Sequence, residues 1–370
     1  MVDLTIELFI PGLFGLPVLP LAARMQTPAL DRLLGTARLV GKSSDSARTA
    51  TNDFKGLIPA LGLDVAFAKS WPTAPYCLSV DDPNWDGMGF WLQADPVHLR
   101  ADRDQLRLFD SGVLGISPGE ACQLVAELNV HFNADGILLH APVPERWYLR
   151  APGPVALRTR ALRTVMGGAT LADAMPDGGD ARCWNALMNE AQMLLHQSPV
   201  NQARAEAGRA AINGLWLSGP GTYAPLGLAS DLRLVIGDDP LVLGLARAGG
   251  VPTASMDDRA LPELMAKIPE GRILLINLEL VDALRRGDLP GWEAAVQQLD
   301  RRLAPVLAWV LDQPGGRTRP KWSVHLHDGS GARWIRKVGW MGRLGDWFGK
   351  RLGWRRTGGL AVARAAVHGR

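Results

Sequence analysis

The sequence predicts an α/β protein in which a largely parallel sheet lies between helices and the chain is interrupted by a small inserted α+β domain. Segments typical of strands and of helices alternate over the last third of the chain. Such alternation indicates parallel strands joined by crossover helices. In order, the segments are 232–236 (strand), 240–248 (helix), 273–278 (strand) and 292–311 (helix).

A strand, a loop and a helix open the chain. Leu4 to Ile10 is an alternating apolar run that ends at Pro11-Gly12, which indicates a buried strand followed by a turn. Thr27 precedes Pro28, so Thr27 is the expected N-cap and Pro28 the first helical residue.

Domain boundaries are expected near residues 75 and 210. Several prolines follow a helical segment that ends near Trp71 and interrupt regular structure there. Short strand-like runs follow over 90–110, and Pro118-Gly119-Glu120 begins a helix. The run 212–217 is a strand at which we expect the chain to rejoin its first domain. The predicted domains are 1–75 with 210–330, an inserted lid-like domain at 76–209, and a basic, Trp-rich segment at 331–370.

Composition indicates a folded protein in a reducing compartment. Apolar residues make up 47% and charged residues 21% of 370 residues, unlike a disordered chain. Cys77, Cys122 and Cys183 form no CxxC pair and leave one cysteine unmatched, so a secreted disulfide scaffold is not expected. No uninterrupted run of eighteen apolar residues occurs. We therefore expect a cytoplasmic location.

Several segments resemble those of a known family. Residues 27–33 resemble its TPxLDxL helix start, and Ser198-Pro199-Val200-Asn201 with Arg204 resembles its HPVNxxR segment. Residues 235–246 and 275–300 are similar to the strands and helices that follow. The family is the archaeal-type cofactor-independent phosphoglycerate mutases of the alkaline phosphatase superfamily, and the resemblance covers most of residues 4–330. It implies an alkaline-phosphatase-like core with an inserted lid.

A second resemblance concerns the inserted segment. Residues 94–99, Ala-Asp-Pro-Val-His-Leu, are similar to a segment of the RpfE-type regulatory proteins of bacteria. These proteins are regarded as relatives that lack known chemistry, so this resemblance implies a regulatory role.

The chemistry implied by the mutase resemblance requires two cations held by carboxylates and histidines, with a hydroxyl nucleophile between them. The family's DGxxDxP frame reads here as residues 11–17, in which Gly12 and Pro17 persist and both acids are missing. The position of the nucleophilic serine aligns with Pro59. Ser43, Ser44 and Ser46 are near it in sequence, but a polar turn before a helix is their more common explanation.

Five residues remain as candidates for an anion site or a remnant of the metal site. The family's DxxxH corresponds to Asp282 and Arg286, so a cation replaces a metal ligand. Where an Asp-His pair is expected, the chain has His325, His327 and Asp328. Arg286 could replace metal charge beside an anion. His325 and His327 point to one face of a strand and could chelate a metal, although a surface pair is more common.

The segment 331–370 is the expected interaction surface. Between Arg333 and Arg356 it has eight basic residues against the single acid Asp346. Trp340, Trp347 and Trp354 recur every seven residues, as on one face of a helix. We expect this face to contact the protein's own body, a second copy or a protein partner. A membrane surface, at the inner face of the membrane, ranks second, and nucleic acid is not expected.

Three functional hypotheses stay open. The first is a non-catalytic relative of the mutases, without a cofactor, that has a regulatory or protein-interaction role. The second is an active metal-dependent phosphoglycerate mutase or phosphatase, using Mn, Mg or Zn, whose ligands are rearranged. The third is a metal-free enzyme of unknown chemistry. Because fold outlasts function, the resemblance supports the architecture more strongly than the activity.

Overall fold

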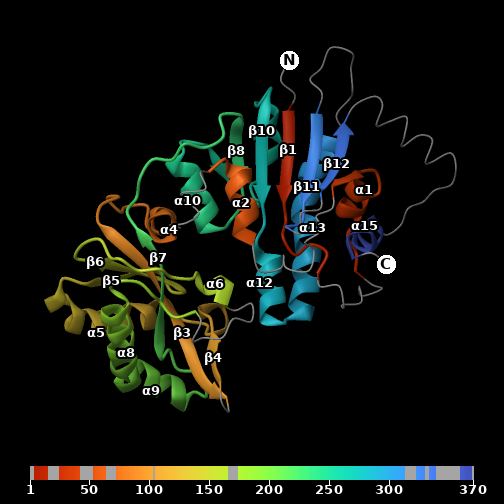
Figure 1. The fold of residues 1–370 in the computed structure, drawn as a ribbon. Helices are drawn as coiled ribbons and strands as arrows, with labels where there is room; N and C mark the ends of the chain where they lie inside the picture. The colour runs from red at the N-terminus through yellow and green to blue at the C-terminus, as the bar shows by residue number, and fades with distance from the viewer. Residues whose placement is uncertain are drawn as a thin grey trace. The chain divides into compact units, whose positions relative to one another are not determined.

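The structure is a computed structural model that describes residues 4–15, 25–41, 53–63, 72–102, 105–165, 174–312, 322–329, 333–338 and 359–368. The chain divides into two compact units (Figure 1). Unit 1 is Met1–Leu63 with Gly227–Arg370, and unit 2 is Asp64–Leu226. Each unit is described by itself below.

Unit 1 contains a seven-stranded sheet in the order β2-β12-β11-β1-β10-β8-β9 (Figure 1). β1 pairs in parallel with β10 and β11, and β10 pairs in parallel with β8, so the centre of the sheet is parallel. β12 is antiparallel to both of its neighbours. The strands are β1 (Leu4–Phe9), β2 (Arg38–Gly41), β8 (Leu232–Ile236), β9 (Thr253–Ala254), β10 (Gly271–Ile276), β11 (Trp322–His327) and β12 (Arg333–Val338). The predicted fold class is confirmed.

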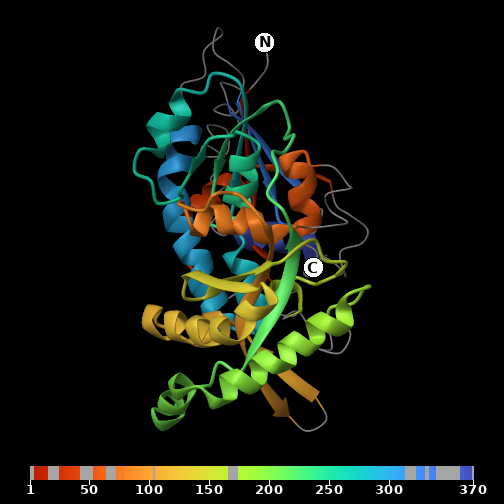
Figure 2. The ribbon, with the colours of Figure 1, turned by 90° about the vertical axis from the view of Figure 1, so that its left-hand side faces the viewer.

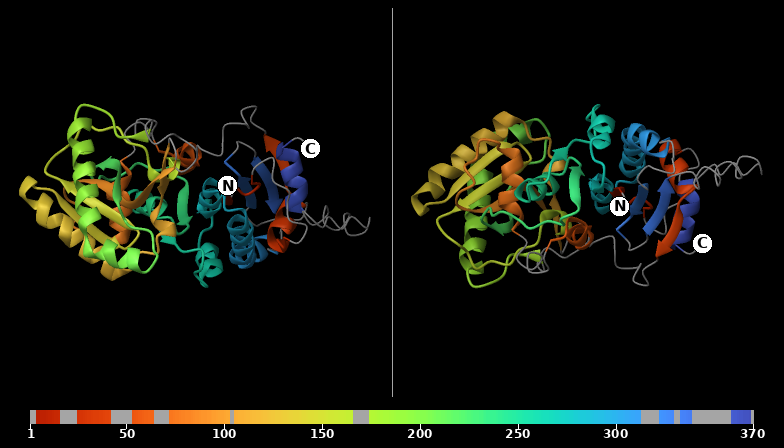
Figure 3. Two further views of the ribbon diagram at one scale, coloured as in Figure 1. Left: turned by 90° about the horizontal axis from the view of Figure 1, so that it is seen from below. Right: turned by 90° about the horizontal axis from the view of Figure 1, so that it is seen from above.

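The core of unit 1 lies between one face of this sheet and its helices. Leu4, Ile6 and Leu8 of β1 share this core with Leu303 and Leu307 of the longest helix. The helices are α1 (Pro28–Leu34), α2 (Asp53–Leu61), α10 (Pro240–Ala248), α11 (Leu261–Ala266), α12 (Glu279–Arg286), α13 (Leu289–Leu311) and α15 (Gly359–His368). α1 packs on both α13 and α15, and Figure 3 shows α15 beside α1.

The start of α1 differs in one respect from the expectation. Thr27 is at the N-cap position and Pro28 at the start of the helix, but the Thr27 side chain caps no amide. The carboxylate of Asp300 on α13 accepts hydrogen bonds from the amides of Ala29 (3.3 Å) and Leu30 (2.8 Å) instead. The cap therefore comes from another helix, and no residue near Thr27 in the sequence indicates it.

Unit 2 contains a five-stranded antiparallel sheet. β4, β3, β6 and β5 follow one another, and β7 pairs with β3. Its strands are β3 (Phe90–Asp102), β4 (Gln105–Phe109), β5 (Leu138–Val143), β6 (Arg146–Ala151) and β7 (Gly214–Gly221). Its helices are α4 (Thr73–Asp81), α5 (Pro118–Phe132), α6 (Leu162–Val165), α8 (Ala181–Gln197) and α9 (Pro199–Glu206). α5, α8 and α9 pack against one another (Figure 2), and α4 packs on β3 and β7.

Two predicted boundaries are corrected. The strand expected to rejoin the first domain after residue 210 is β7, which pairs with β3 of unit 2 because Leu215 and Leu217 complete that unit's core. α4 also belongs to unit 2, so the units change after Leu63 and after Leu226 rather than near 75 and 210.

The segment 331–370 is only partly a tail. Residues 333–338 form β12, since Trp334 is buried against Phe14 with ring centroids 4.7 Å apart. Residues 359–368 form α15, whose Leu360 amide donates to Asp31 (2.8 Å). Trp340, Trp347 and Trp354 lie outside the described residues. In the part of the chain that the structure describes, no helix is long and apolar enough to span a membrane.

Candidate functional site

The carboxyl edge of the parallel strands of unit 1 is the natural place for a site. β1, β10, β8 and β11 all end there, and open α/β sheets bind ligands at this edge. The residues that follow these strands are therefore the first candidates for ligands.

The turn after β1 provides no oxygen-bearing side chain at this edge. Gly12 has φ +80°, and a Cβ atom there would lie 3.0 Å from Leu284 Cδ1 and 3.3 Å from the backbone of Val281. The indole of Trp292 donates to the Gly12 carbonyl (2.9 Å), and Leu13 and Phe14 are buried. The turn is packed against α12 and α13, so the carboxylate expected from the mutase frame has no counterpart here.

Asp282 and Arg286 both lie on α12, one turn apart. Asp282 is partly exposed and its Oδ1 atom lies 3.8 Å from Nη1 of Arg285, whose side chain is buried. Arg286 is exposed in the last turn of the helix. α12 follows β10, whereas His325 and His327 lie within β11 on the other side of β1.

His325 and His327 face away from the core of unit 1, because Val324 and Leu326, which alternate with them along β11, face into it. Their neighbour is Glu7 of β1, which is opposite His325 in the sheet register. His327 Nε2 lies 3.0 Å from Glu7 Oε1, and Arg272 Nη1 donates to Glu7 Oε2 (2.8 Å). These side chains therefore form an ion cluster on the second face of the sheet.

The surroundings of this cluster favour the ionised form of Glu7 and the neutral form of His325. Burial raises the pKa of Glu7, but the contacts with His327 and Arg272 outweigh burial and lower the pKa to about 2. Burial lowers the pKa of His325. Sequence reasoning missed Arg272, although a charged residue within an apolar strand was a visible signal.

Asp328 is separate from the two histidines. It follows β11 directly, is buried, and its backbone carbonyl accepts from the amide of Gly12 (3.3 Å). Strand alternation directs it away from the face of His325 and His327. The structure therefore brings His325 and His327 together with Glu7, and it places Asp328, Asp282 and Arg286 elsewhere on the unit.

A guanidinium stands among three carboxylates at the same carboxyl edge. Arg302 of α13 donates from Nε to Asp257 (2.7 Å) and contacts Asp238, and its Nη1 lies 3.6 Å from Glu279. Only 10% of the arginine side chain is exposed. The acids follow β8, β9 and β10, so the protein supplies its own cation where these strands end. Among the described residues, no group of three or more His, Cys, Asp or Glu is placed to hold a metal ion.

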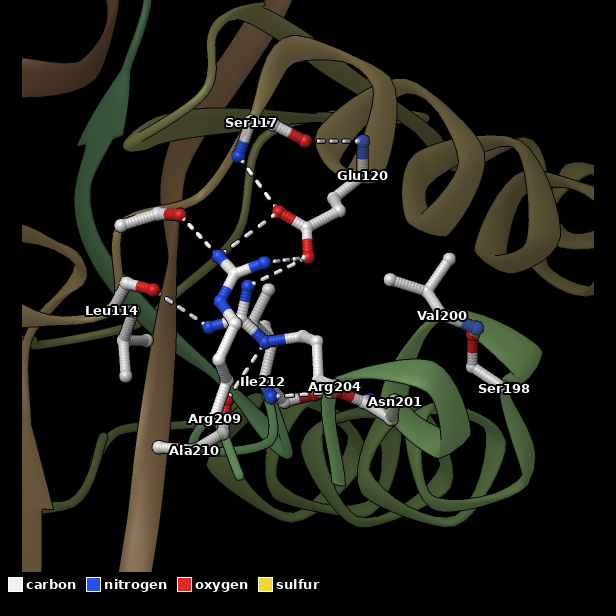
Figure 4. A network of polar contacts seen from close by, with 11 residues as sticks. Leu114, Ser117, Glu120, Ser198, Val200, Asn201, Arg204, Arg209, Ala210 and Ile212 are labelled. Carbon is white, nitrogen blue, oxygen red and sulfur yellow. Dashed lines mark hydrogen bonds and ion pairs between the residues drawn. The ribbon is translucent and has the colours of Figure 1, made fainter. Parts of the chain in front are cut away.

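The segment that resembles HPVNxxR has a structural role in unit 2. Ser198 caps α9 by accepting from the amide of Val200 (3.2 Å). Asn201 donates to the carbonyls of Leu195 (2.7 Å) and Ile212 (2.8 Å) and accepts from the Ile212 amide (2.8 Å). This side chain joins α8, α9 and the start of β7 (Figure 4).

Arg204 completes this network (Figure 4). Its guanidinium donates to Glu120 (2.9 Å) and to the carbonyls of Leu114 (2.6 Å) and Ala210 (2.8 Å). Burial raises the pKa of Glu120, but the Ser117 amide and Arg204 outweigh burial and lower it to about 2. The hydrogen bonds of Arg204 therefore hold parts of unit 2 together.

Among the described residues, the position that aligns with the nucleophilic serine has no hydroxyl group. Pro59 is inside α2, and Ser43, Ser44 and Ser46 lie outside the described residues. Gly219 lies within β7, where a Cβ atom would come within 2.0 Å of Thr73 Oγ1. Glycine at 219 therefore allows α4 to approach β7.

Comparison with known proteins shows which sequences this chain resembles. No family model matches the sequence. The chain is 29% identical to the 2,3-bisphosphoglycerate-independent phosphoglycerate mutase 1 of Archaeoglobus fulgidus over 153 residues, which are 37% of each protein. It is 23% identical to the corresponding mutase of Methanosarcina mazei over 316 residues, 78% of this chain and 76% of that protein.

A solved structure supports the fold. The PH0037 protein of Pyrococcus horikoshii matches with a TM-score of 0.51 and 14% identity, covering 92% of this chain and 88% of that one. At that identity the match concerns the fold alone. The sequence matches relate this chain to the archaeal cofactor-independent phosphoglycerate mutase family.

Proposed function

We propose that this chain is a non-catalytic relative of the cofactor-independent phosphoglycerate mutases with a regulatory or protein-interaction role, as in the RpfE-type regulatory proteins. The observation that carries the proposal is the turn after β1: its described residues, 10–15, have no carboxylate, and Gly12 is packed against α12. A two-metal site needs such ligands to fix both cations.

The charge arrangement at the carboxyl edge also supports the proposal. Arg302 already neutralises part of the charge of Asp238, Asp257 and Glu279. Arg286 stands where the related enzymes are expected to have a metal-binding histidine. Arg302 therefore weakens the attraction of these three carboxylates for an entering metal cation.

The proposed partner is another protein or a second copy of the chain, in the cytoplasm, with the segment 331–370 as the contact. A membrane surface is the second candidate, because several basic side chains near acidic lipid each contribute about 1 kcal/mol.

Metal content tests the proposal. The purified chain is incubated with Mn²⁺, Zn²⁺ and Mg²⁺, excess metal is removed, and bound metal is quantified beside the A. fulgidus mutase treated identically. Conversion of 3-phosphoglycerate is then assayed for both. We expect no retained metal and no conversion for this chain.

Two tightly held metals per chain together with conversion would overturn the proposal. They would favour an active mutase or phosphatase with rearranged ligands that uses Mn, Mg or Zn. Conversion without metal would instead point to a metal-free enzyme and would equally contradict a non-catalytic role.

A further inference from the structure

Unit 2 contains a buried carboxyl group with an unmatched oxygen. Asp95 lies on β3, opposite Trp216 of β7 in the register, and only 7% of the residue is exposed. Among the residues that the structure describes, its Oδ1 atom has no hydrogen-bond partner. A buried carboxylate without partners is strongly disfavoured relative to the neutral acid.

The pairing of Gln93 with Tyr148 brings Asp95, two residues further along β3, level with Arg146 of β6, and this cation is already bonded to a second carboxylate. Arg146 of β6 donates from Nε and Nη2 to the two oxygens of Asp81 at 2.7 Å each. The Tyr148 hydroxyl donates to the same carboxylate at 2.6 Å. Asp81 is the last residue of α4, so this bidentate pair ties the end of α4 to the sheet. Asp81 is therefore bonded to this guanidinium, whereas the Oδ1 atom of Asp95 is not.

The charges around Asp95 come from several elements. They are Asp81 from α4, Arg146 from β6, Arg163 from α6 and Asp110 from the end of β4. Burial is the largest influence and raises the pKa of Asp95 to about 7, while the two arginines oppose it and the two acids add to it. The neutral hydroxyl of Tyr148 and the thiol of Cys77 lie in the same region, and burial raises the pKa of Tyr148 far above its usual value.

We propose that Asp95 makes the attachment of α4 to the unit 2 sheet sensitive to pH near neutrality. With its proton, Asp95 is a neutral neighbour of the Asp81–Arg146 pair. Without it, the Asp95 carboxylate competes with Asp81 for Arg146 and weakens the contacts of Arg146 and Tyr148 with the end of α4. The proton leaves to solvent, and no covalent bond other than the O–H bond of Asp95 is broken.

One other pair at the end of α4 must be separated from this contribution. His140 Nε2 lies 2.9 Å from Asp82 Oδ2, and both side chains are partly exposed. Asp82 directly follows Asp81, so a change in this contact would also affect this end of the helix. A variant without the imidazole isolates the contribution of Asp95.

The experiment compares full-length protein with Asp95→Asn, which mimics the neutral acid, and His140→Gln. Hydrogen-exchange protection factors of α4 and of β3 are measured from pH 5.5 to 8.5. Protection factors already correct for the pH dependence of chemical exchange. From the pKa of about 7, we expect wild-type protection to fall about tenfold between pH 6 and pH 8. His140→Gln should fall equally, and Asp95→Asn should stay constant.

Infrared spectroscopy gives a second readout that does not depend on stability. A carboxylic-acid carbonyl band should be present at pH 6, decline as pH rises towards 8, and be missing in Asp95→Asn. The proposal is overturned if wild-type protection is independent of pH, if Asp95→Asn retains the wild-type dependence, or if His140→Gln abolishes it. An unfolded Asp95→Asn variant would leave the infrared band and His140→Gln to decide.

Discussion

Arg204 is the residue whose replacement should damage unit 2 most. Arg204→Met keeps the apolar stem and removes three donors from a side chain that is 1% exposed. It leaves the carbonyls of Leu114 and Ala210 without this donor, each costing about 1–3 kcal/mol if buried and unpaired. Removing one partner of a buried ion pair costs about 3–5 kcal/mol. These costs overlap, so we expect a total loss of about 3–5 kcal/mol.

The control is Arg209→Met, because Arg209 contacts the same Glu120 carboxylate from a side chain that is 40% exposed. Exposed ion pairs contribute about 0–1 kcal/mol. Both variants are unfolded in urea, and exchange of the Ile212 and Val200 amides assigns the loss to this network. A difference below about 1 kcal/mol between the variants would refute the view that Arg204 holds α9, α5 and the start of β7 together.

Two further changes test unit 1. Asp300→Ala should destabilise the protein by about 0.5–2 kcal/mol, because the amides of Ala29 and Leu30 lose their cap. Asp300→Asn retains one acceptor and should lose less; equal stability of all three proteins in urea would contradict this cap. Glu7→Gln should cost up to about 3 kcal/mol near pH 7, since the pKa of Glu7 is lowered from 4.5 to about 2. This contribution is complete above pH 4.5 and is lost as pH falls towards 2, so the two melting temperatures should converge in acid; a constant difference would contradict it.

The elements that could be predicted from the sequence are those with a local signal. The apolar run at β1, the Thr27-Pro28 helix start and the alternation from β8 to α13 each depend on neighbouring residues. The cap of α1 could not be predicted, because Asp300 is far away in sequence. β7 was recognised as a strand, but a strand's own pattern does not say which sheet it joins.

Of the candidate site, only the missing metal ligands could be predicted from the sequence. The missing acids after β1 are visible in the sequence around Gly12. The three carboxylates around Arg302 are contributed by three separate segments, so only the folded sheet brings them together. β12 was missed because residues 331–370 were treated as one basic, Trp-rich segment, whereas burial of Trp334 depends on Phe14 near the other end of the chain.

The position of β1 in its sheet constrains how the protein can be made. Leu4 pairs with Gly271 on one side and with Trp322 on the other, so β1 can enter the sheet only after β10 and β11, which are synthesised much later. Unit 2 is continuous in sequence and can complete its own core during that interval. Until β10 and β11 are synthesised, β1 exposes unpaired backbone and an apolar face, as slow-folding parallel sheets do. Dependence on chaperones during synthesis should therefore arise from unit 1 rather than from unit 2.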